Sequence, residues 1–348
     1  MEVKHLFFVH NWRTFLIAEL IIANSLSLSN TPSEVFYVAA RGFATILNKI
    51  GINSIFDLDP VFEVPYSYLN SCSPHKERDL LRVYSMISDF LGSSGFILYI
   101  PHLADAWMRF IASHENIKGI HFIEEGNKYS ASQQDSACST SSKGLLLAPT
   151  LFDKGLTTMF CQQIHNPELL KGSIFFCTQD NAHVRVKKII YSDSEIILCL
   201  NDLLRNNRYL RSKNLIGQRL KRRKIPVLVG AKTYLDQTIF SKMLKEALSC
   251  SNERASLLAY KPHPSCRHHY SRSSRDFLMA QGIILCNSNL PIDLLIYTGS
   301  SPSLIGDTSS FLVSARRLDV EVDFIGMLDQ TPNIRCSELE AIYSKARG

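Results

Sequence analysis

Short apolar runs alternate along the chain with longer stretches in which apolar residues recur at helical spacing. The runs are rich in β-branched and aromatic residues, which favour strands, whereas the spacing in the longer stretches favours helices. Alternation of this kind predicts an α/β fold with parallel sheets. The expected strands are residues 6–9, 34–39, 95–100, 119–123, 172–177, 188–191, 225–229, 255–260, 282–286 and 322–325.

The chain has 348 residues, which is too many for one ordinary hydrophobic core. Each half has about the size of one doubly wound α/β unit, so we predict two domains, residues 1–168 and 169–348. The expected helices are residues 14–25, 74–91, 104–113, 236–247 and 309–317.

Composition narrows the class of protein. Hydrophobic residues make up 45% and charged residues 20%, which indicates a globular chain. The nine cysteines are scattered without a CxxC pair, which favours free thiols in a reducing compartment over disulfides or zinc, and we expect no metal. The apolar residues 15–23 contain Glu19 and are too few for a membrane span or a secretory signal. We therefore expect a cytoplasmic protein.

The net charge is +6, and part of the excess comes from the basic run at residues 221–224. We interpret this run as the solvated end of a helix. No aromatic-rich nucleic-acid motif accompanies it, so nucleic acid is not an expected partner. A peripheral contact of this basic surface with the inner membrane is the alternative.

The first candidate site is Glu124-Glu125-Gly126, directly after the predicted strand 119–123. Side chains at the carboxyl ends of parallel strands face the crevice in which open α/β sheets bind ligands. Adjacent residues of an extended chain point in opposite directions, so only one of the two acids should enter that crevice. A carboxylate there suits general-base chemistry, with two solvated acids in a turn as the alternative.

The second candidate is Lys261-Pro262-His263-Pro264, after the predicted strand 255–260. Proline on both sides restricts the backbone of His263 and pins its imidazole. Such a histidine can donate a hydrogen bond to a phosphate, and Lys261 can contact an anion or a base carbonyl. The alternative is a stiff loop with exposed polar residues.

The third candidate lies in the segment 306–310, before another apolar run. Thr308 or Ser309 can cap the helix that follows, and its free N–H groups, with hydroxyls such as that of Ser310, can bind an anion. Upstream, Asp293 begins another predicted helix and can accept from ribose hydroxyls or stabilise the helix terminus.

Together these motifs resemble the bacterial sialyltransferases of GT-B fold, including polysialyltransferases and lipooligosaccharide sialyltransferases. Those families share a D/E-D/E-G motif, an HP motif and a serine pair, in the order found here. The first predicted strand with the following His10 and Asn11 is similar too. The resemblance implies two Rossmann-like domains whose parallel sheets face an interdomain cleft, an acceptor domain first and a donor domain second.

The resemblance also implies a reaction: inverting transfer from CMP-sialic acid to a hydroxyl of a glycan or glycolipid, without metal or other cofactor. Glu124 would be the general base, and His263 would hydrogen-bond the departing phosphate. Lys261 would contact cytosine, and Asp293 the ribose. The remaining implied site residues are Pro264, Thr308, Ser309 and Ser310 for the donor, and Asn11, Arg41, Glu125 and Gly126 for the acceptor or the cleft.

Two alternatives stay open at this point. The first is a GT-B transferase that uses another CMP-nonulosonic acid or a UDP-sugar, because the same residue types recognise the parts that many nucleotide donors share. The second is a non-catalytic nucleotide- or glycan-binding protein. The acceptor could be a lipid-linked glycan, a lipooligosaccharide terminus or a growing polysialic chain.

Overall fold

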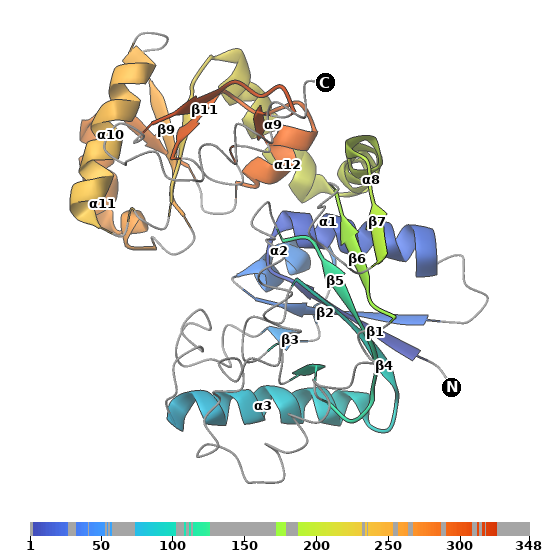
Figure 1. Cartoon of the computed structure of the whole chain (residues 1–348). Coiled ribbons are helices and arrows are strands. Elements are labelled where there is room, and N and C mark those ends of the chain that lie inside the picture. Colours follow the sequence, from blue (N-terminus) through green and yellow to red (C-terminus); the bar gives the residue numbers. More distant parts are fainter. Residues whose placement is uncertain are drawn as a thin grey trace. The chain divides into compact units, whose positions relative to one another are not determined.

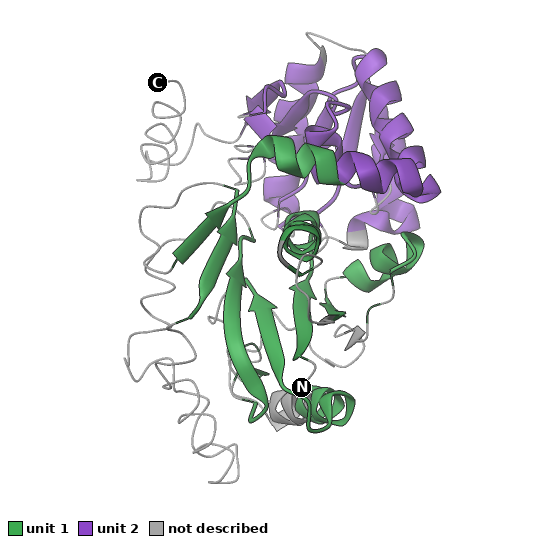
Figure 2. Ribbon diagram, turned by 90° about the vertical axis from the view of Figure 1, so that its right-hand side faces the viewer, with its two compact units in different colours: residues 1–199 green, residues 200–348 purple. Residues whose placement is uncertain are grey.

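The computed structural model forms two compact units, residues 1–199 and 200–348 (Figures 1 and 2). The structure describes residues 3–26, 33–40, 42–52, 54, 56–57, 74–101, 108, 111–112, 114–125, 172–178, 187–231, 234, 236–252, 257–263, 267–286, 290–307, 312, 315–316 and 318–325.

Unit 1 is built on a seven-stranded sheet in the order β3-β2-β1-β4-β5-β6-β7, and all its strand pairs are parallel. The strand order reverses direction between β1 and β4, as in the doubly wound dinucleotide-binding fold. The strands are β1 Val3–Val9, β2 Ser33–Ala39, β3 Phe56–Asp57, β4 Phe96–Ile100, β5 Ile117–Ile123, β6 Ile174–Cys177 and β7 Lys187–Ile190.

The core of unit 1 is centred on β1, in which every residue from position 5 to position 9 is buried. Burial on both faces explains why this strand is a continuous apolar run without alternation. Phe7 stacks on Tyr99 of β4 at 4.1 Å between ring centroids, and Phe15 of α1 is fully buried. The helices are α1 Trp12–Ile21, which continues as the π-helical turn η1 Ile22–Leu26, and α2 Phe43–Lys49 and α3 Pro74–Leu91. Helix α8 Asp193–Asn206 contains the boundary between the two units at residues 199 and 200.

Unit 2 repeats this plan on a smaller scale. Its parallel sheet has the order β10-β9-β8-β11-β12, and the order reverses between β8 and β11. Tyr260 of β9 and Phe240 of α10 belong to its buried core. The strands are β8 Val227–Val229, β9 Leu258–Lys261, β10 Ile283–Leu285, β11 Leu304–Gly306 and β12 Val322–Phe324, and the helices are α9 Arg208–Arg222, α10 Gln237–Asn252, η4 Arg267–Tyr270, α11 Arg272–Ala280 and α12 Ile292–Tyr297.

The predicted α/β class with two Rossmann-like parallel sheets is confirmed. Every predicted strand has its counterpart, but β6 and β7, which were expected in the second half, belong to the first sheet, where β6 pairs with β5 and β7 pairs with β6. The predicted boundary at 168/169 lies outside the described residues, and so does most of the predicted helices 104–113 and 309–317. The acceptor and donor roles of the two halves stay predictions.

None of the helices in the described part of the chain combines the length and the apolar character that crossing a membrane requires.

Candidate functional site

The first polar cluster lies at the carboxyl edge of the unit 1 sheet, where β1 leads into α1. Asn11 is the N-cap of α1, and its Oδ1 accepts a hydrogen bond from the backbone N–H of Thr14 at 2.9 Å. The hydroxyl of Thr14 lies 3.0 Å from the carbonyl of Asn11 and 3.3 Å from the backbone nitrogen of His10. This reciprocal capping satisfies N–H groups that have no partner within the helix, and it fixes the backbone at residues 10 and 11.

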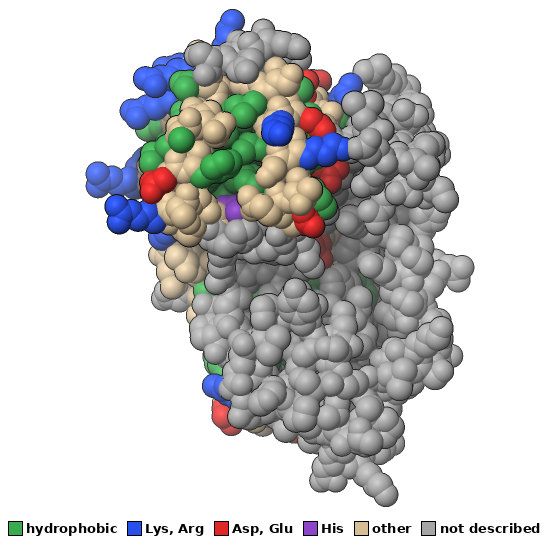
Figure 3. Space-filling model, turned by 90° about the vertical axis from the view of Figure 1, so that its left-hand side faces the viewer, with side chains coloured by type: hydrophobic (Ala, Val, Ile, Leu, Met, Phe, Trp, Pro, Cys, Tyr) green, Lys and Arg blue, Asp and Glu red, His purple; other side chains and the backbone are tan. Residues whose placement is uncertain are grey.

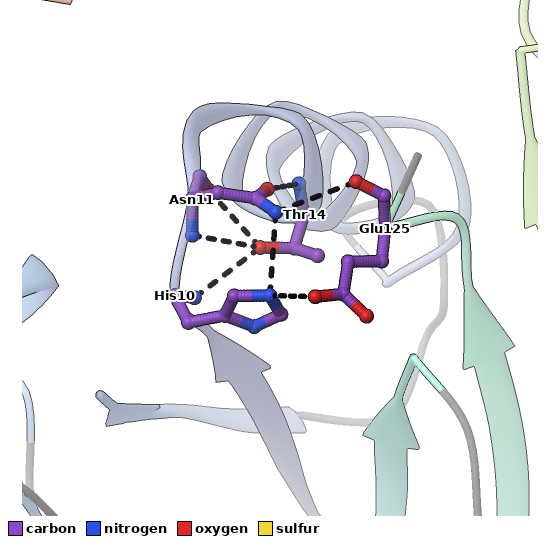
Figure 4. A network of polar contacts seen from close by, with 4 residues as sticks. All are labelled: His10, Asn11, Thr14 and Glu125. Carbon is purple, nitrogen blue, oxygen red and sulfur yellow. Dashed lines mark hydrogen bonds and ion pairs between the residues drawn. The ribbon is translucent and has the colours of Figure 1, made fainter. Parts of the chain in front are cut away.

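The fixed turn presents His10 to the loop after β5 (Figure 4). Nε2 of His10 lies 2.6 Å from Oε1 of Glu125, and Nδ2 of Asn11 donates to the backbone carbonyl of Glu125 at 3.4 Å. When Glu125 is ionised, its carboxylate only accepts hydrogen bonds, and Nε2 of His10 is then the donor of this contact. The His10 side chain is 1% exposed and that of Glu125 is 24% exposed, so Glu125 is the member of the pair that solvent or a ligand can reach.

The neighbouring Glu124 points to the other side of the chain and is almost completely buried. Its Oε1 accepts from Nη1 of Arg13 at 2.7 Å. Its Oε2 accepts from the backbone N–H and the hydroxyl of Thr178, at 2.6 and 2.8 Å. Glu124 thus ties together α1, β5 and the end of β6, and charge-assisted hydrogen bonds of this kind are among the stronger ones in proteins.

The expectation that the two acids face different directions is confirmed by these contacts. Sequence reasoning placed Glu124 at the reacting centre, but it did not identify the partners Arg13 and Thr178, or the pairing of His10 with Glu125. His10 and Thr178 each directly follow an apolar run, and that position is the signal that could have found them, whereas Arg13 lies three positions beyond His10, within the helix. The role of Glu124 as a general base stays a prediction.

The second polar cluster lies at the carboxyl edge of the unit 2 sheet, where the ends of β8 and β9 touch. The backbone N–H of Gly230 donates to the carbonyl of Lys261 at 2.8 Å. A Cβ atom at Gly230 would lie 2.5 Å from the backbone nitrogen of His263 and 3.0 Å from the Lys261 carbonyl. Only glycine fits so close an approach, and this packing holds the segment 261–263 in place.

Three ionisable groups interact electrostatically at the same edge. Burial lowers the pKa of the Lys261 ammonium, while electrostatic interaction with Asp293 and, to a smaller extent, with Cys286 opposes this shift. Burial also raises the pKa of the Cys286 thiol to about 11, although Lys261 opposes this shift. Lys261 ends β9, Cys286 follows β10 and Asp293 is in the first turn of α12. The carboxyl edge therefore gathers a lysine and a carboxylate from segments that are distant in the sequence, and their roles toward a ligand stay predictions.

Several predicted site residues lie outside the described part of the chain: Arg41, Gly126, Pro264, Thr308, Ser309 and Ser310. Gly306, which precedes the predicted anion site, ends β11, and a Cβ atom there would lie 2.8 Å from the Leu312 side chain. Within the described residues, no group of three or more His, Cys, Asp or Glu side chains could hold a metal ion.

Comparison with solved structures identifies the fold as GT-B-like. A UDP-GlcNAc 2-epimerase from Neisseria meningitidis, bound to UDP-GlcNAc, is 15% identical over 98% of this chain and 85% of its own, with a TM-score of 0.51. A UDP-GlcNAc 2-epimerase from Methanocaldococcus jannaschii, in complex with UDP-GlcNAc and UDP, is 10% identical over 97% of this chain and 87% of its own, with a TM-score of 0.53. No family model matches the chain, and no curated protein matches its sequence.

The resemblance to sialyltransferases is contradicted by these findings. The similar structures are UDP-GlcNAc 2-epimerases, so the assignments as a sialyltransferase and of CMP-sialic acid as the donor are wrong. The motifs led to a wrong assignment because all three, an acidic pair, an HP pair and a serine pair, are short. At the carboxyl ends of strands they suit carbohydrate and phosphate chemistry in general, and they do not specify the base of the nucleotide.

Proposed function

We propose that this chain is a nucleotide-sugar enzyme whose substrate is a UDP-activated sugar. The observation that carries the proposal is the placement of one polar cluster at the carboxyl edge of each Rossmann-like sheet, in a fold shared with UDP-GlcNAc 2-epimerases. In unit 1 the polar cluster includes residues that follow β1, and in unit 2 it includes a residue that follows β8. At each of these two strands the order of the strands in the sheet reverses direction. That reversal is where doubly wound sheets bind nucleotides and sugars.

In this proposal unit 2 binds the UDP part. The segment 261–263 is held against Gly230, so the position of its backbone is set before a ligand arrives. Lys261 and His263 supply donors for the diphosphate or the uracil carbonyls, and Asp293 supplies an acceptor for ribose hydroxyls. Because Lys261 is buried, its charged ammonium has lost hydration, which raises its free energy. A bound anion would stabilise the charged form.

Unit 1 supplies the acid–base group. Glu125 is partly exposed, and its carboxylate is oriented by the Nε2–H of the buried His10. A carboxylate held in this way can take a proton from the reacting group of the sugar or of an acceptor, and the proton transferred to Glu125 then lies beside the imidazole. Glu124 already accepts from three donors, which makes it the better anchor of the two acids.

Phosphorus and proton NMR of the chain incubated with UDP-GlcNAc, with and without a panel of sugar acceptors, tests the proposal. We expect the UDP-GlcNAc signals to decay into those of UDP or of a second UDP-hexose. Release of UDP indicates transfer or hydrolysis, and a second UDP-hexose indicates epimerisation. A UDP-GlcNAc spectrum that stays unchanged, while UDP-glucose and UDP-galactose are also left intact, would contradict the proposal.

A further inference from the structure

Helix α9 presents to solvent a strip of cations that surrounds two aliphatic side chains. Eight of the 38 Lys and Arg residues of the chain lie between Arg208 and Lys224, and no Asp or Glu interrupts them. Leu215 is 53% exposed and Ile216 is 40% exposed. Because residues three or four positions apart share a helix face, Leu215 lies in one row with Arg211 and Arg219.

The opposite face of α9 is fixed on α12 (Figure 1). A Cβ atom at Gly217 would lie 2.6 Å from the Leu295 side chain, so the two helices approach closely there. Lys221 donates to the carbonyl of Gly299 at 2.8 Å, and the Thr298 hydroxyl donates to the Asn214 side chain at 3.0 Å. These contacts set the rotation of α9 about its axis, and the exposed row cannot turn inward without breaking them.

We propose that this strip, formed by Arg208, Arg211, Leu215, Ile216, Arg219, Arg222 and Arg223, docks the protein on an anionic lipid surface. Its cations attract acidic headgroups, since juxtamembrane Lys and Arg residues each strengthen binding to such surfaces. Leu215 and Ile216 are then buried at the boundary between headgroups and acyl chains, as the apolar residues of interfacial helices are. Nucleic acid also attracts cations, but a phosphate backbone offers no apolar partner to two exposed aliphatic side chains.

Docking through α9 goes beyond the proposed reaction. It would hold unit 2 at a membrane surface by contact with headgroups, and it would favour substrates or acceptors that carry a lipid. None of the residues of the strip belongs to the polar clusters described above, so the docking and the reaction can be tested separately.

Flotation of the full chain with phosphatidylcholine vesicles, with and without added phosphatidylglycerol, tests the proposal. We expect binding to the anionic vesicles alone, and weaker binding as the salt concentration rises. The triple variant Arg211→Gln, Arg219→Gln, Arg222→Gln should weaken binding by about 100-fold, because each cation near an anionic surface contributes roughly fivefold. The double variant Leu215→Ser, Ile216→Ser should weaken it by about tenfold or more.

Matched controls come from α10 and α11, whose face in Figure 3 also exposes hydrophobic side chains beside cations. The triple variant Lys245→Gln, Arg272→Gln, Arg275→Gln removes the same charge, and Phe277→Ser, Met279→Ser removes similar apolar surface. Both controls should bind vesicles like the unmodified chain. Three results would each overturn the proposal. The chain does not float with anionic vesicles, or the controls lose as much vesicle binding as the α9 variants. The third is that the chain binds duplex DNA but not vesicles, and the α9 variants abolish the DNA binding.

Discussion

Two adjacent glutamates in the loop after β5 have different surroundings and, we infer, different tasks. Glu124 is 6% exposed and is paired with Arg13 at 2.7 Å, whereas Glu125 is 24% exposed and is paired with His10. The direction of each side chain follows from the alternation of an extended chain. The sequence could therefore predict that the two acids separate, but which of them becomes buried depends on Arg13 and Thr178, which are distant in the chain.

Glu125→Gln tests the proposed acid–base role. The amide keeps the shape of the side chain but cannot take a proton, so we expect kcat on a UDP-sugar to fall by about 10²–10⁴-fold. The affinity for UDP should stay within a few-fold, because the proposed nucleotide site lies in unit 2. Steady-state kinetics and calorimetry measure the two quantities. If Glu124→Gln shows this loss and Glu125→Gln does not, the base is Glu124.

Glu124→Ala tests the anchoring role. Loss of the carboxylate breaks its ion pair with the 12% exposed Arg13 and its hydrogen bonds with Thr178, and breaking a largely buried pair typically costs about 3–5 kcal/mol in the free energy of unfolding. Urea denaturation followed by circular dichroism measures this cost. Glu34→Ala is the matched control, because the Lys4–Glu34 pair is long, at 3.9 Å, and its glutamate is 43% exposed. Exposed pairs contribute about 0–1 kcal/mol, so equal losses in the two variants would refute the anchoring role.

The partly buried His121 on β5 predicts how the stability of the protein depends on pH. Burial and the neighbouring His5 lower its pKa from 6.5 to about 4, and its Nδ1 accepts from the backbone N–H of Ile174 at 3.2 Å. Above pH 6.5 the folded and unfolded states both hold a neutral imidazole. As the pH falls from 6.5 to about 4, only the unfolded state gains the proton, so stability should fall by up to about 3 kcal/mol.

The measurement is the free energy of unfolding across this pH range. His121→Asn keeps an acceptor for the Ile174 N–H but does not titrate there, so this variant should lose less stability as the pH falls. The pKa values of His5 and His114 are also lowered by burial, so a smaller slope of the same sign should remain. An identical slope in the variant would show that His121 is not buried as described.

At the scale of the elements, the long and strongly patterned segments were predictable. Residues 74–91 form α3 as expected, and the apolar run at 6–9 forms most of β1. Strand β11 was not predicted, because its apolar run is only Leu304-Ile305, between Ser303 and Gly306. Sheet membership depends on pairing between distant segments, such as Phe122 with Phe175, so no local pattern could place β6 in the first sheet.

The contact between the ends of β8 and β9 is an element-scale feature with a direct test. In Gly230→Ala the new methyl group meets backbone atoms, which cannot rotate away, so we expect a loss of about 1–3 kcal/mol in stability. UDP affinity should fall as well, because the segment 261–263 shifts. Gly119→Ala in β5 is the control, since nothing lies within 4 Å of its Cβ position, and thermal melts and UDP titrations compare the two. A Gly230→Ala chain that melts and binds UDP normally would contradict the close packing.

At the scale of the whole molecule, the sequence predicts two Rossmann-like sheets and places candidate chemistry at their carboxyl edges, and the sheets are confirmed. The sequence motifs implied a CMP-activated donor, and this prediction is wrong. Cytosine and uracil differ in a few hydrogen-bonding atoms, and no short motif at a strand end specifies which of them fits. Two solved structures of this fold contain UDP-GlcNAc, and a UDP-sugar is our proposal for this chain.

Calorimetric titration of UDP against CDP tests the central claim most directly, because the two ligands carry the same phosphates and differ only in the base. We expect UDP to bind at least roughly tenfold more tightly than CDP, because the wrong base leaves a buried polar group without its partner. CDP binding as tightly as UDP, or CMP binding more tightly than either, would contradict the central claim.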